Sequence, residues 1–576
     1  MKSIVLWSPT HSASARPTIS PKESLHICVS LALKALIALL GTTILINAVY
    51  AQDYDLAILD GRVMDPETGF DAVRNVGIKD GKIAIITSEK VVGEQTIDAS
   101  GHVVAPGFVD YHTHAIDALG EKLGLRDGVT TGMDLEGGAL NVSRWYESQA
   151  GNRAMNYGTT VSQIGARMLI HDSEEMEGQD KYDLDGPLDA RQLTDLFNDT
   201  ATDGVVGWSR SRSNLDQLNR SNEILDEGLR QGALGVGSVV GYMREGVTSF
   251  EQFLAQKAAA NYGRVTCVHA RFYPGGLAPV EHPIGFDEVF TNAFTLDAPL
   301  LYQHNMDYGW WEIEAKLAKA REKGLNVWSE MYPYVGGSTV ISAEYLLPDT
   351  FEKSGNIYGA NADEGGIYDP VLDKFYTKDE FLEMREKEPG RFIIVYYVIR
   401  KPWILEWIRT PHMTVASDGV FSATPNSFET PYEDYAGHPR TAGTRARTLR
   451  LARENGIDLM HVIANASYWP ARHLGDTGVE AMQVRGRIQE GMVADITIFD
   501  PDTVTDNATY RIREQGLPST GIPYVIINGT IVVNDSQVQE VYPGEAIRFP
   551  AEEEGRFVPL TEKEFLLQFP RRFLSD

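Results

Sequence analysis

Eight short apolar segments, separated by stretches with helical periodicity, place the strongest limit on how this chain folds. Strands that alternate with helices form parallel sheets, because a crossover helix joins each strand to the next. Eight such units favour a closed TIM-type (β/α)8 barrel of the α/β class over an open doubly wound sheet. The predicted strands are 108–111, 129–135, 159–164, 234–239, 264–269, 300–304, 326–331 and 413–417.

The two ends of the chain have a different residue pattern. Apolar and polar residues alternate over 55–59 and 76–78, with turn signals at Asp60-Gly61 and Asp80-Gly81, and a similar pattern returns after residue 490. We therefore expect a small β-sandwich domain built from both ends. The predicted organisation is a sandwich of 52–104 and 486–548, a catalytic barrel of 105–485 and a C-terminal tail of 549–576.

One connection inside the predicted barrel is too long for an ordinary loop. Residues 343–411 include an apolar run at 392–398 and a charged helical stretch at 378–387. Segments of this length inside a compact domain are usually functional, as lids over a site are. We predict a lid, or a small subdomain, over the barrel mouth.

The first fifty residues have the pattern of a targeting segment. Lys22 and Lys34 precede a 12-residue apolar run at 35–46, and Val49-Tyr50-Ala51 resembles a cleavage site. The run is too short to be a permanent membrane anchor. We expect residues 1–51 to be a signal peptide and the protein to be secreted or periplasmic. Cleavage would remove Cys28, so Cys267 alone could form no internal disulfide.

The chain is strongly acidic, with a formal net charge of −28. Such a surface repels nucleic acids and anionic membranes, so we expect a small molecule as the partner. The charge also keeps an exported protein soluble. Nothing in the sequence predicts an oligomeric state.

The sharpest motif is His112-Thr113-His114, at the end of the first predicted strand. Residues two apart in an extended segment point the same way, so both imidazoles face one spot. Two imidazoles supply half of a tetrahedral zinc shell. Catalytic groups collect at the carboxyl ends of barrel strands. Four other strand ends carry further metal-binding side chains, which are Asp134, Glu136, His269, His304 and Asp418.

Several stretches together resemble the amidohydrolase superfamily. They are 104–114, which holds the histidine pair, Gly128-Val129-Thr130-Thr131, Val268-His269-Ala270-Arg271, Ser417-Asp418-Gly419 and 491–496. Two later stretches, 332–339 and 437–444, resemble its D-aminoacylase branch, the N-acyl-D-amino-acid deacylases. The resemblance extends from about residue 54 to 541, which is nearly all of the expected mature chain.

The resemblance implies a set of metal ligands. His112 and His114 would bind one divalent ion with Asp418 nearby, and His269 and His304 would bind a second. The branch usually has a cysteine ligand after strand two, but this chain has none there. We expect Glu136 to replace it, since a carboxylate bridges two ions, with Asp134 as the alternative. The expected cofactor is one or two divalent ions, with zinc preferred.

The remaining candidate residues concern the reaction itself. Asp418 is the expected catalytic residue, taking a proton from water and passing it to the leaving amine. Tyr334 and Ser338 are predicted to contact the substrate, Tyr334 as a donor to the scissile carbonyl. Arg271 and Arg440 are candidates for binding its carboxylate. The branch often has a lysine two residues after His304, and this chain has Met306 there, so the usual carboxylate contact is missing or relocated.

Three hypotheses for function follow. The first is an N-acyl-D-amino-acid deacylase that uses metal-activated water on a small N-acylated amino acid. The second is another member of the superfamily, either a cyclic amidase such as a dihydroorotase or hydantoinase, or a dipeptidase. The third is a periplasmic binding protein that kept the barrel and lost catalysis. The presence of Asp418 argues against the third.

Overall fold

A computed structural model describes residues 54–172, 186, 188–189, 191–192, 207–271, 281–353 and 355–566. The chain divides into two compact units, Met1–Tyr54 and Asp55–Asp576. The predicted signal peptide, 1–51, lies outside the described residues. Within the described ranges, no helix combines the length and the hydropathy that crossing a bilayer requires.

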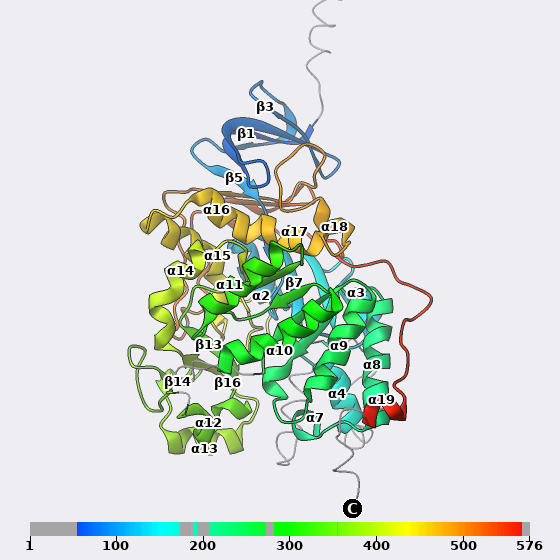
Figure 1. The fold of residues 1–576 in the computed structure, drawn as a ribbon. Coiled ribbons are helices and arrows are strands. Elements are labelled where there is room, and N and C mark those ends of the chain that lie inside the picture. Colours follow the sequence, from blue (N-terminus) through cyan, green and yellow to red (C-terminus); the bar gives the residue numbers. More distant parts are fainter. Residues whose placement is uncertain are drawn as a thin grey trace, which may run out of the picture. The chain divides into compact units, whose positions relative to one another are not determined.

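Eight parallel strands form the central sheet, which confirms the predicted barrel class (Figure 1). Their order is β17-β12-β11-β10-β9-β8-β7-β6, so strands adjacent in sequence are neighbours in space. Each overlaps one predicted segment. Their bounds are β6 Phe108–Asp110, β7 Val129–Ala139, β8 Asn156–Ser162, β9 Gly235–Val239, β10 Val265–His269, β11 Leu300–Tyr302, β12 Val327–Met331 and β17 Met413–Val415.

The first and last strands of this sheet meet just beyond their carboxyl ends. The Asp418 amide donates to the His112 carbonyl at 2.8 Å, and the His114 amide donates to the Gly419 carbonyl at 2.7 Å. The Ser417 amide also donates to a carboxylate oxygen of Asp110, at 3.1 Å. These bonds close the barrel at its mouth and place Asp418 beside the histidine pair.

Helices between the strands cover the outside of the barrel (Figure 1). The helix α8 shows why they form: Asn214 and Gln217 make a capping box at its start, and Leu218, Leu225 and Leu229 recur on its buried side. The barrel helices are α2 Ala118–Arg126, α3 Val142–Gln149, α4 Gln163–His171, α7 Gly207–Arg210, α8 Leu215–Arg230, α9 Ser249–Asn261, α10 Glu281–Leu296, α11 Trp310–Arg321, α14 Ile404–Arg409, α15 Arg440–Glu454, α16 Leu459–Ile463, α17 Trp469–Gly475 and α18 Glu480–Gln483.

A nine-stranded sheet draws on both ends of the described chain. Its order is β21-β20-β19-β18-β5-β1-β2-β3, with β4 paired to β1. The antiparallel pair β5 and β18 joins the N-terminal strands to the C-terminal ones. The bounds are β1 Tyr54–Asp65, β2 Phe70–Lys79, β3 Lys82–Thr87, β4 Gly93–Asp98, β5 Val103–Pro106, β18 Ile496–Phe499, β19 Tyr524–Ile527, β20 Thr530–Asn534 and β21 Gln537–Val538.

Gly107 links this sheet to the barrel, since it lies between β5 and β6. A Cβ atom at this position would lie 2.2 Å from the hydroxyl oxygen of Thr130. Only glycine allows such a close approach. The passage from β5 into the first barrel strand, and hence the position of the histidine pair, depends on it.

A four-stranded sheet is inserted between β12 and β17. Its order is β13-β16-β14-β15, and its strands are β13 Gly336–Val340, β14 Gly366–Asp369, β15 Lys374–Phe375 and β16 Phe392–Tyr396. The predicted charged helix is present as α13, Lys378–Lys387, which begins with a capping box at Thr377 and Glu380. The inserted sheet begins at Gly336, before the predicted start at 343. The small residues of β13 carry no strand signal, and its pairing with β16 decides its conformation.

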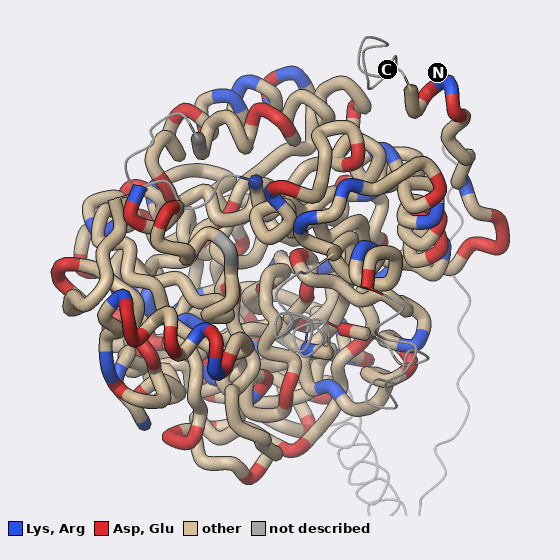
Figure 2. Tube along the Cα trace, turned by 90° about the horizontal axis from the view of Figure 1, so that it is seen from below, with Lys and Arg blue, Asp and Glu red and all other residues tan. Residues whose placement is uncertain are grey.

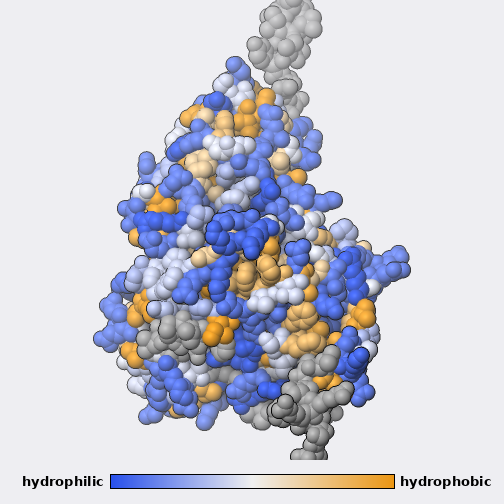
Figure 3. Space-filling model, in the orientation of Figure 1, coloured by the Kyte–Doolittle hydropathy of each residue, from blue (hydrophilic) through white to orange (hydrophobic). Residues whose placement is uncertain are grey.

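Charged residues of both signs are spread over the surface (Figure 2). Hydrophilic side chains cover most of the face seen in Figure 3, with smaller apolar patches between them. The acidic excess of the sequence is therefore distributed over the described surface, in keeping with a small-molecule partner.

Two histidines at the amino-terminal end of β17 predict a pH-dependent stability. His412 Nδ1 lies 3.2 Å from His473 Nε2, and the His473 ring stacks on Trp328 at 4.6 Å. Burial lowers the pKa of His412 to about 4, and it holds the pKa of His473 well below its usual value. The unfolded chain binds protons near pH 6.5, so the free energy of unfolding should fall as the pH drops from about 6.5 towards 4.

The variant His412→Asn should make the melting temperature less dependent on pH over this range. Asparagine tolerates the left-handed backbone that this position requires, with φ at 64°. Thermal unfolding followed by circular dichroism from pH 7 to pH 4.5 measures the effect, with His102→Asn, in the turn before β5, as the control. If the melting temperature depended on pH equally in the wild type and in His412→Asn, the prediction would be contradicted.

Candidate metal centre

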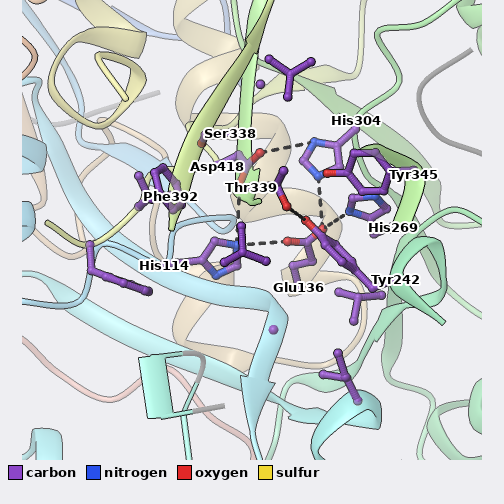
Figure 4. A pocket seen from close by; sticks show the side chains of 18 of the residues that line it. His114, Glu136, Tyr242, His269, His304, Ser338, Thr339, Tyr345, Phe392 and Asp418 are labelled. Atoms are coloured by element: carbon purple, nitrogen blue, oxygen red, sulfur yellow. Dashed lines mark hydrogen bonds and ion pairs between the residues drawn. The ribbon is translucent and has the colours of Figure 1, made fainter. Parts of the chain in front are cut away.

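The structure brings all six predicted metal ligands to one place at the barrel mouth. Figure 4 shows five of them, all except His112. Five strands supply them. His112 and His114 follow β6, Glu136 lies in β7, and His269 is the last residue of β10. The other two are His304, which follows β11, and Asp418, which follows β17.

Glu136 is at the centre of the cluster. Its Oε2 lies 3.0 Å from Nε2 of His112 and 3.0 Å from Nε2 of His114. Its Oε1 lies 2.7 Å from Nδ1 of His269 and 3.1 Å from Nε2 of His304. One carboxylate therefore faces two pairs of imidazoles, with one oxygen for each pair. This is the geometry of a carboxylate that bridges two ions.

Asp418 faces the same imidazoles from the other side. Its Oδ1 is 3.4 Å from Nε2 of His112 and 3.7 Å from Nε2 of His114, and its Oδ2 is 3.7 Å from Nδ1 of His304. The same Oδ2 forms an ion pair with Arg440, whose Nη2 is 2.8 Å away. Arg440 thus fixes one oxygen of Asp418 and leaves the other towards the histidine pair.

Two further carboxylates hold the histidine pair in place. The Nδ1 atom of His112 contacts Oε1 of Glu330, which is buried in β12. The Nδ1 atom of His114 lies 2.9 Å from Oδ2 of Asp134. Such contacts set the tautomer and the ring orientation of metal-binding histidines, leaving Nε2 for the ion. Asp134, the alternative ligand in the sequence analysis, therefore lies behind His114, while Glu136 occupies the central position.

Glu330 was not among the residues predicted from the sequence. A signal for it was present, because a glutamate within the apolar run 327–331 needs a buried partner. What the sequence could not give was the identity of that partner, which is 218 residues away along the chain.

Electrostatics in the cluster favour a positive charge. Burial lowers the pKa of His112, but the carboxylates of Glu330 and Glu136 outweigh it and hold that pKa well above its usual value. At His114, burial again lowers the pKa, but the carboxylates of Asp134 and Glu136 outweigh it and raise the pKa to about 10. Burial lowers the pKa of His304 to about 4, so this imidazole is neutral at pH 7. The same carboxylates would attract a divalent cation.

Two members of the cluster have unusual backbone conformations. His304 and Asp418 lie in the left-handed region, with φ at 54° and 48°. Residues other than glycine are held there at a cost of about 1 to 3 kcal/mol, and such residues concentrate at functional sites. The hydrogen bond from the Asp418 amide to the His112 carbonyl helps to maintain this conformation.

The residues of the cluster fit a divalent metal. Within each of three groups of side chains, the potential ligand atoms lie within 4.8 Å of one another. All donors are imidazole nitrogens or carboxylate oxygens, which zinc and other first-row ions accept. The groups are His112, His114, Glu136 and Asp418; Glu136, His269 and His304; and His112, His304 and Glu330.

A cavity of about 160 Å³ opens onto the cluster. His114, Glu136, His269, His304 and Asp418 form one side of it. Ser338 lines it as well, and the Ser338 hydroxyl is buried with no hydrogen-bond partner among the described residues. Tyr242 and Tyr332, which the sequence analysis did not select, also reach the cavity.

Of the four predicted substrate-binding residues, Ser338 alone lies among the described residues that line the cavity. Arg271 is paired with Glu288 at 2.8 Å and also donates to two backbone carbonyls. Arg440 pairs with Asp418 and lies 4.6 Å above the Tyr332 ring. Tyr334 points away, with its hydroxyl 3.5 Å from the Pro439 carbonyl.

Tyr332 occupies the place that we predicted for Tyr334. Strand β12 ends at Met331, so side-chain alternation is not maintained across the residues that follow it. The Tyr332 hydroxyl accepts from Arg400 Nη1 at 3.4 Å, which leaves its own hydrogen available as a donor. Arg400 in turn is held by both carboxylate oxygens of Asp307, each at 3.0 Å.

The contact between Glu330 and His112 predicts a weaker metal site in Glu330→Gln. Loss of a carboxylate that orients a ligand usually lowers metal affinity by about 10-fold to 100-fold. Competition with a zinc-binding dye measures this affinity. Glu314→Gln is the matched control, because Glu314 is also buried but contacts Asn305 and Ser329. Equal zinc affinity in the wild type and Glu330→Gln would show that Glu330 does not support the site.

Comparisons with known proteins show which proteins this chain is similar to. No family model matches the chain. The chain is 27% identical over 504 residues to the N-acyl-D-glutamate deacylase of Alcaligenes xylosoxydans xylosoxydans, covering 83% of this chain and 93% of that protein. It is 23% identical over 543 residues to the D-aminoacylase of the same organism, covering 86% of this chain and 98% of that protein. The predicted resemblance to the D-aminoacylase branch is confirmed over most of the chain.

Solved structures show the same fold. A D-aminoacylase described as defining a novel subset of amidohydrolases is matched with a TM-score of 0.65 at 20% identity, covering 86% of this chain and 99% of that one. An N-acyl-D-glutamate deacylase from Bordetella bronchiseptica, complexed with zinc and a phosphonate inhibitor, is matched with a TM-score of 0.65 at 22% identity, covering 86% and 100%.

Proposed function

We propose that this chain is a metal-dependent amide hydrolase that deacylates N-acyl-D-amino acids, releasing a free amino acid and a carboxylate. The observation that carries the proposal is the position of Glu136 between two pairs of imidazoles, at the mouth of a barrel. The curated relatives that match over most of this chain are deacylases of this kind.

The candidate ligands are His112, His114, Glu136, His269, His304 and Asp418, and zinc is the preferred ion. An ion held by them would lower the pKa of a water molecule from about 15.7 towards 7 and polarise the scissile carbonyl. Glu136 offers one oxygen to each side of the cluster, so the set accommodates one ion or two.

Asp418 is the proposed proton carrier. Its Oδ1 faces the histidine pair, where the attacking water would lie, and Arg440 holds its Oδ2. In this position the carboxylate takes the proton of the water and later delivers it to the leaving nitrogen. The leaving amine then departs as a neutral group.

Hydroxyl groups on the cavity wall would position the substrate. Tyr332 lines the cavity, and because its oxygen accepts from Arg400, its hydroxyl hydrogen would be available to a substrate oxygen. The buried Ser338 hydroxyl is a second donor. Donors aimed at an oxygen that gains negative charge stabilise the tetrahedral intermediate. Tyr332 thus takes the role that the sequence analysis gave to Tyr334.

A panel of N-acetyl-D- and N-acetyl-L-amino acids, dihydroorotate, hydantoins and dipeptides tests the proposal. We expect hydrolysis of N-acetyl-D-amino acids that a chelator abolishes and added zinc restores. Turnover of the cyclic amides or dipeptides alone would favour the second hypothesis, and binding without turnover would favour a binding protein. Hydrolysis that survives complete removal of the metal would exclude the proposed mechanism.

We also propose that the protein is exported to the periplasm or secreted. The apolar run at 35–46, the two lysines that precede it and the Val49-Tyr50-Ala51 stretch support this. N-terminal sequencing of the protein from the producing cells, together with cell fractionation, tests it. A mature chain that begins near residue 52 outside the cytoplasm is expected. An uncleaved chain in the cytoplasm would contradict it.

A further inference from the structure

The side of the cavity away from the imidazole cluster is apolar. Ile164 and Met168 lie one turn apart on α4 and reach the cavity from the barrel. Val340, Phe392 and Val395 reach it from the inserted sheet, where Phe392 pairs with Val340 across β16 and β13. In Figure 4, Phe392 lies on the opposite side of the view from His269 and His304.

The charged groups of the cavity are concentrated at its other end. Among the described residues that line it, Glu136 and Asp418 are the carboxylates, and neither lysine nor arginine is present. Arg191 is not among the lining residues, although its guanidinium carbon lies 5.4 Å from the centroid of the Phe421 ring, which is. A substrate carboxylate placed against the apolar wall would lose its hydration and find no lysine or arginine among the described residues that line the cavity.

We propose that the substrate carries a bulky apolar group, which packs between α4 and the inserted sheet when the amide lies at the metal cluster. This inference rests on the proposed function and specifies its substrate class. An aliphatic acyl chain and an aliphatic or aromatic amino-acid side chain have the same chemistry here. The inserted sheet then contributes directly to specificity, through Phe392 and Val395.

The proposed substrate of this chain differs from the substrates of two of its relatives. Their names state that they act on N-acyl-D-glutamate and N-acyl-D-aspartate, which have acidic side chains. The apolar wall described here would exclude such side chains, because an ionised carboxylate has a large cost of burial without a partner.

The first test compares kcat/KM for four substrates of the zinc-loaded enzyme. N-acetyl-D-phenylalanine and N-acetyl-D-glutamate vary the side chain, while N-octanoylglycine and N-acetylglycine vary the acyl group. We expect the preferred apolar member to exceed the glutamate derivative by about 100-fold or more. A preference for phenylalanine assigns the wall to the side chain, and a preference for octanoyl assigns it to the acyl chain. Equal or faster hydrolysis of the glutamate derivative would overturn the inference.

The second test introduces a cation into the wall. Phe392 is partly exposed, so Phe392→Arg should fold, and its guanidinium offers a cationic partner for a carboxylate. If the apolar group is the side chain, the ratio of kcat/KM for the glutamate derivative to that for the phenylalanine derivative should rise by about 100-fold. If it is the acyl chain, kcat/KM for N-octanoylglycine should fall relative to N-acetylglycine. Leu382→Arg, on the exposed side of α13, is the matched control and should change neither ratio. Unchanged ratios in Phe392→Arg would contradict a role for this wall.

A binding measurement separates a failure of this inference from a failure of the proposed function. Calorimetric titration of the zinc-loaded protein with octanoate, acetate and glutarate needs no turnover. Each methylene buried against the wall should tighten binding about fourfold, so octanoate should bind much more tightly than acetate or glutarate. If no N-acyl amino acid is hydrolysed but octanoate is preferred, the deacylase proposal fails and the apolar wall is supported. Equal affinities for octanoate, acetate and glutarate would show that the apolar wall does not bind an apolar group.

Discussion

The variant Asp418→Asn is expected to lower kcat by about 10³-fold while the protein still binds its metal. Asparagine keeps the shape of aspartate and can still accept from Arg440, but it cannot take up the proton of a water molecule. The four imidazoles and Glu136 remain, so the ligand set is nearly complete. Steady-state kinetics beside metal analysis of the same preparation measures both quantities.

Metal content decides between the two roles of Asp418. If kcat and bound zinc fall together, Asp418 acts as a ligand only and has no separate role in proton transfer. Asp434→Asn is the matched control, because Asp434 is half exposed on the loop after β17 and lies outside the cavity. Wild-type kcat in Asp418→Asn would remove the proposed mechanism.

The variant Glu136→Ala is expected to lose the metal and, with it, activity. Glu136 contacts all four imidazoles of the cluster, whereas each of the other side chains contacts only some of its members. Its removal leaves no carboxylate between the two pairs. We expect zinc affinity to fall by at least about 100-fold, which exceeds the usual effect of losing an orienting carboxylate. Equilibrium dialysis followed by elemental analysis gives affinity and stoichiometry.

Two companion variants sharpen this experiment. Glu136→Gln keeps the shape and one acceptor oxygen, so it should bind one ion more weakly rather than none. Glu245→Ala removes an exposed glutamate and should leave zinc binding unchanged. Full zinc occupancy in Glu136→Ala would show that the histidines and Asp418 suffice and that Glu136 does not bridge.

The sequence was most informative where the signal is local. Alternation of short apolar runs with helical stretches identified eight strands, because burial on both faces of a parallel strand leaves a continuous apolar run. The His112 and His114 pair was recognisable for a similar reason, since two-residue spacing on an extended segment places both rings on one side. Glu136, His269, His304 and Asp418 were found because barrel strands end at one rim.

The sequence was least informative where the signal depends on contacts between distant segments. Arg271 was selected as a substrate contact, but its guanidinium is used by Glu288 and two carbonyls. Glu330 was overlooked, although it orients His112. Tyr334 was chosen where Tyr332 reaches the cavity. In each case the direction or the partner of the side chain was set beyond the end of a strand or by another element.

The sequence itself thus encodes the order of the strands, the strand ends at which metal-binding residues gather and the donor atoms they offer. It does so because periodicity and strand position are properties of neighbouring residues. The tertiary structure alone decided that Glu136 lies between two imidazole pairs while Asp134 and Glu330 lie behind them. It also decided that the inserted sheet completes the cavity with an apolar wall. Those arrangements depend on how elements far apart in the chain pack, and the composition of any one segment does not specify its packing partners.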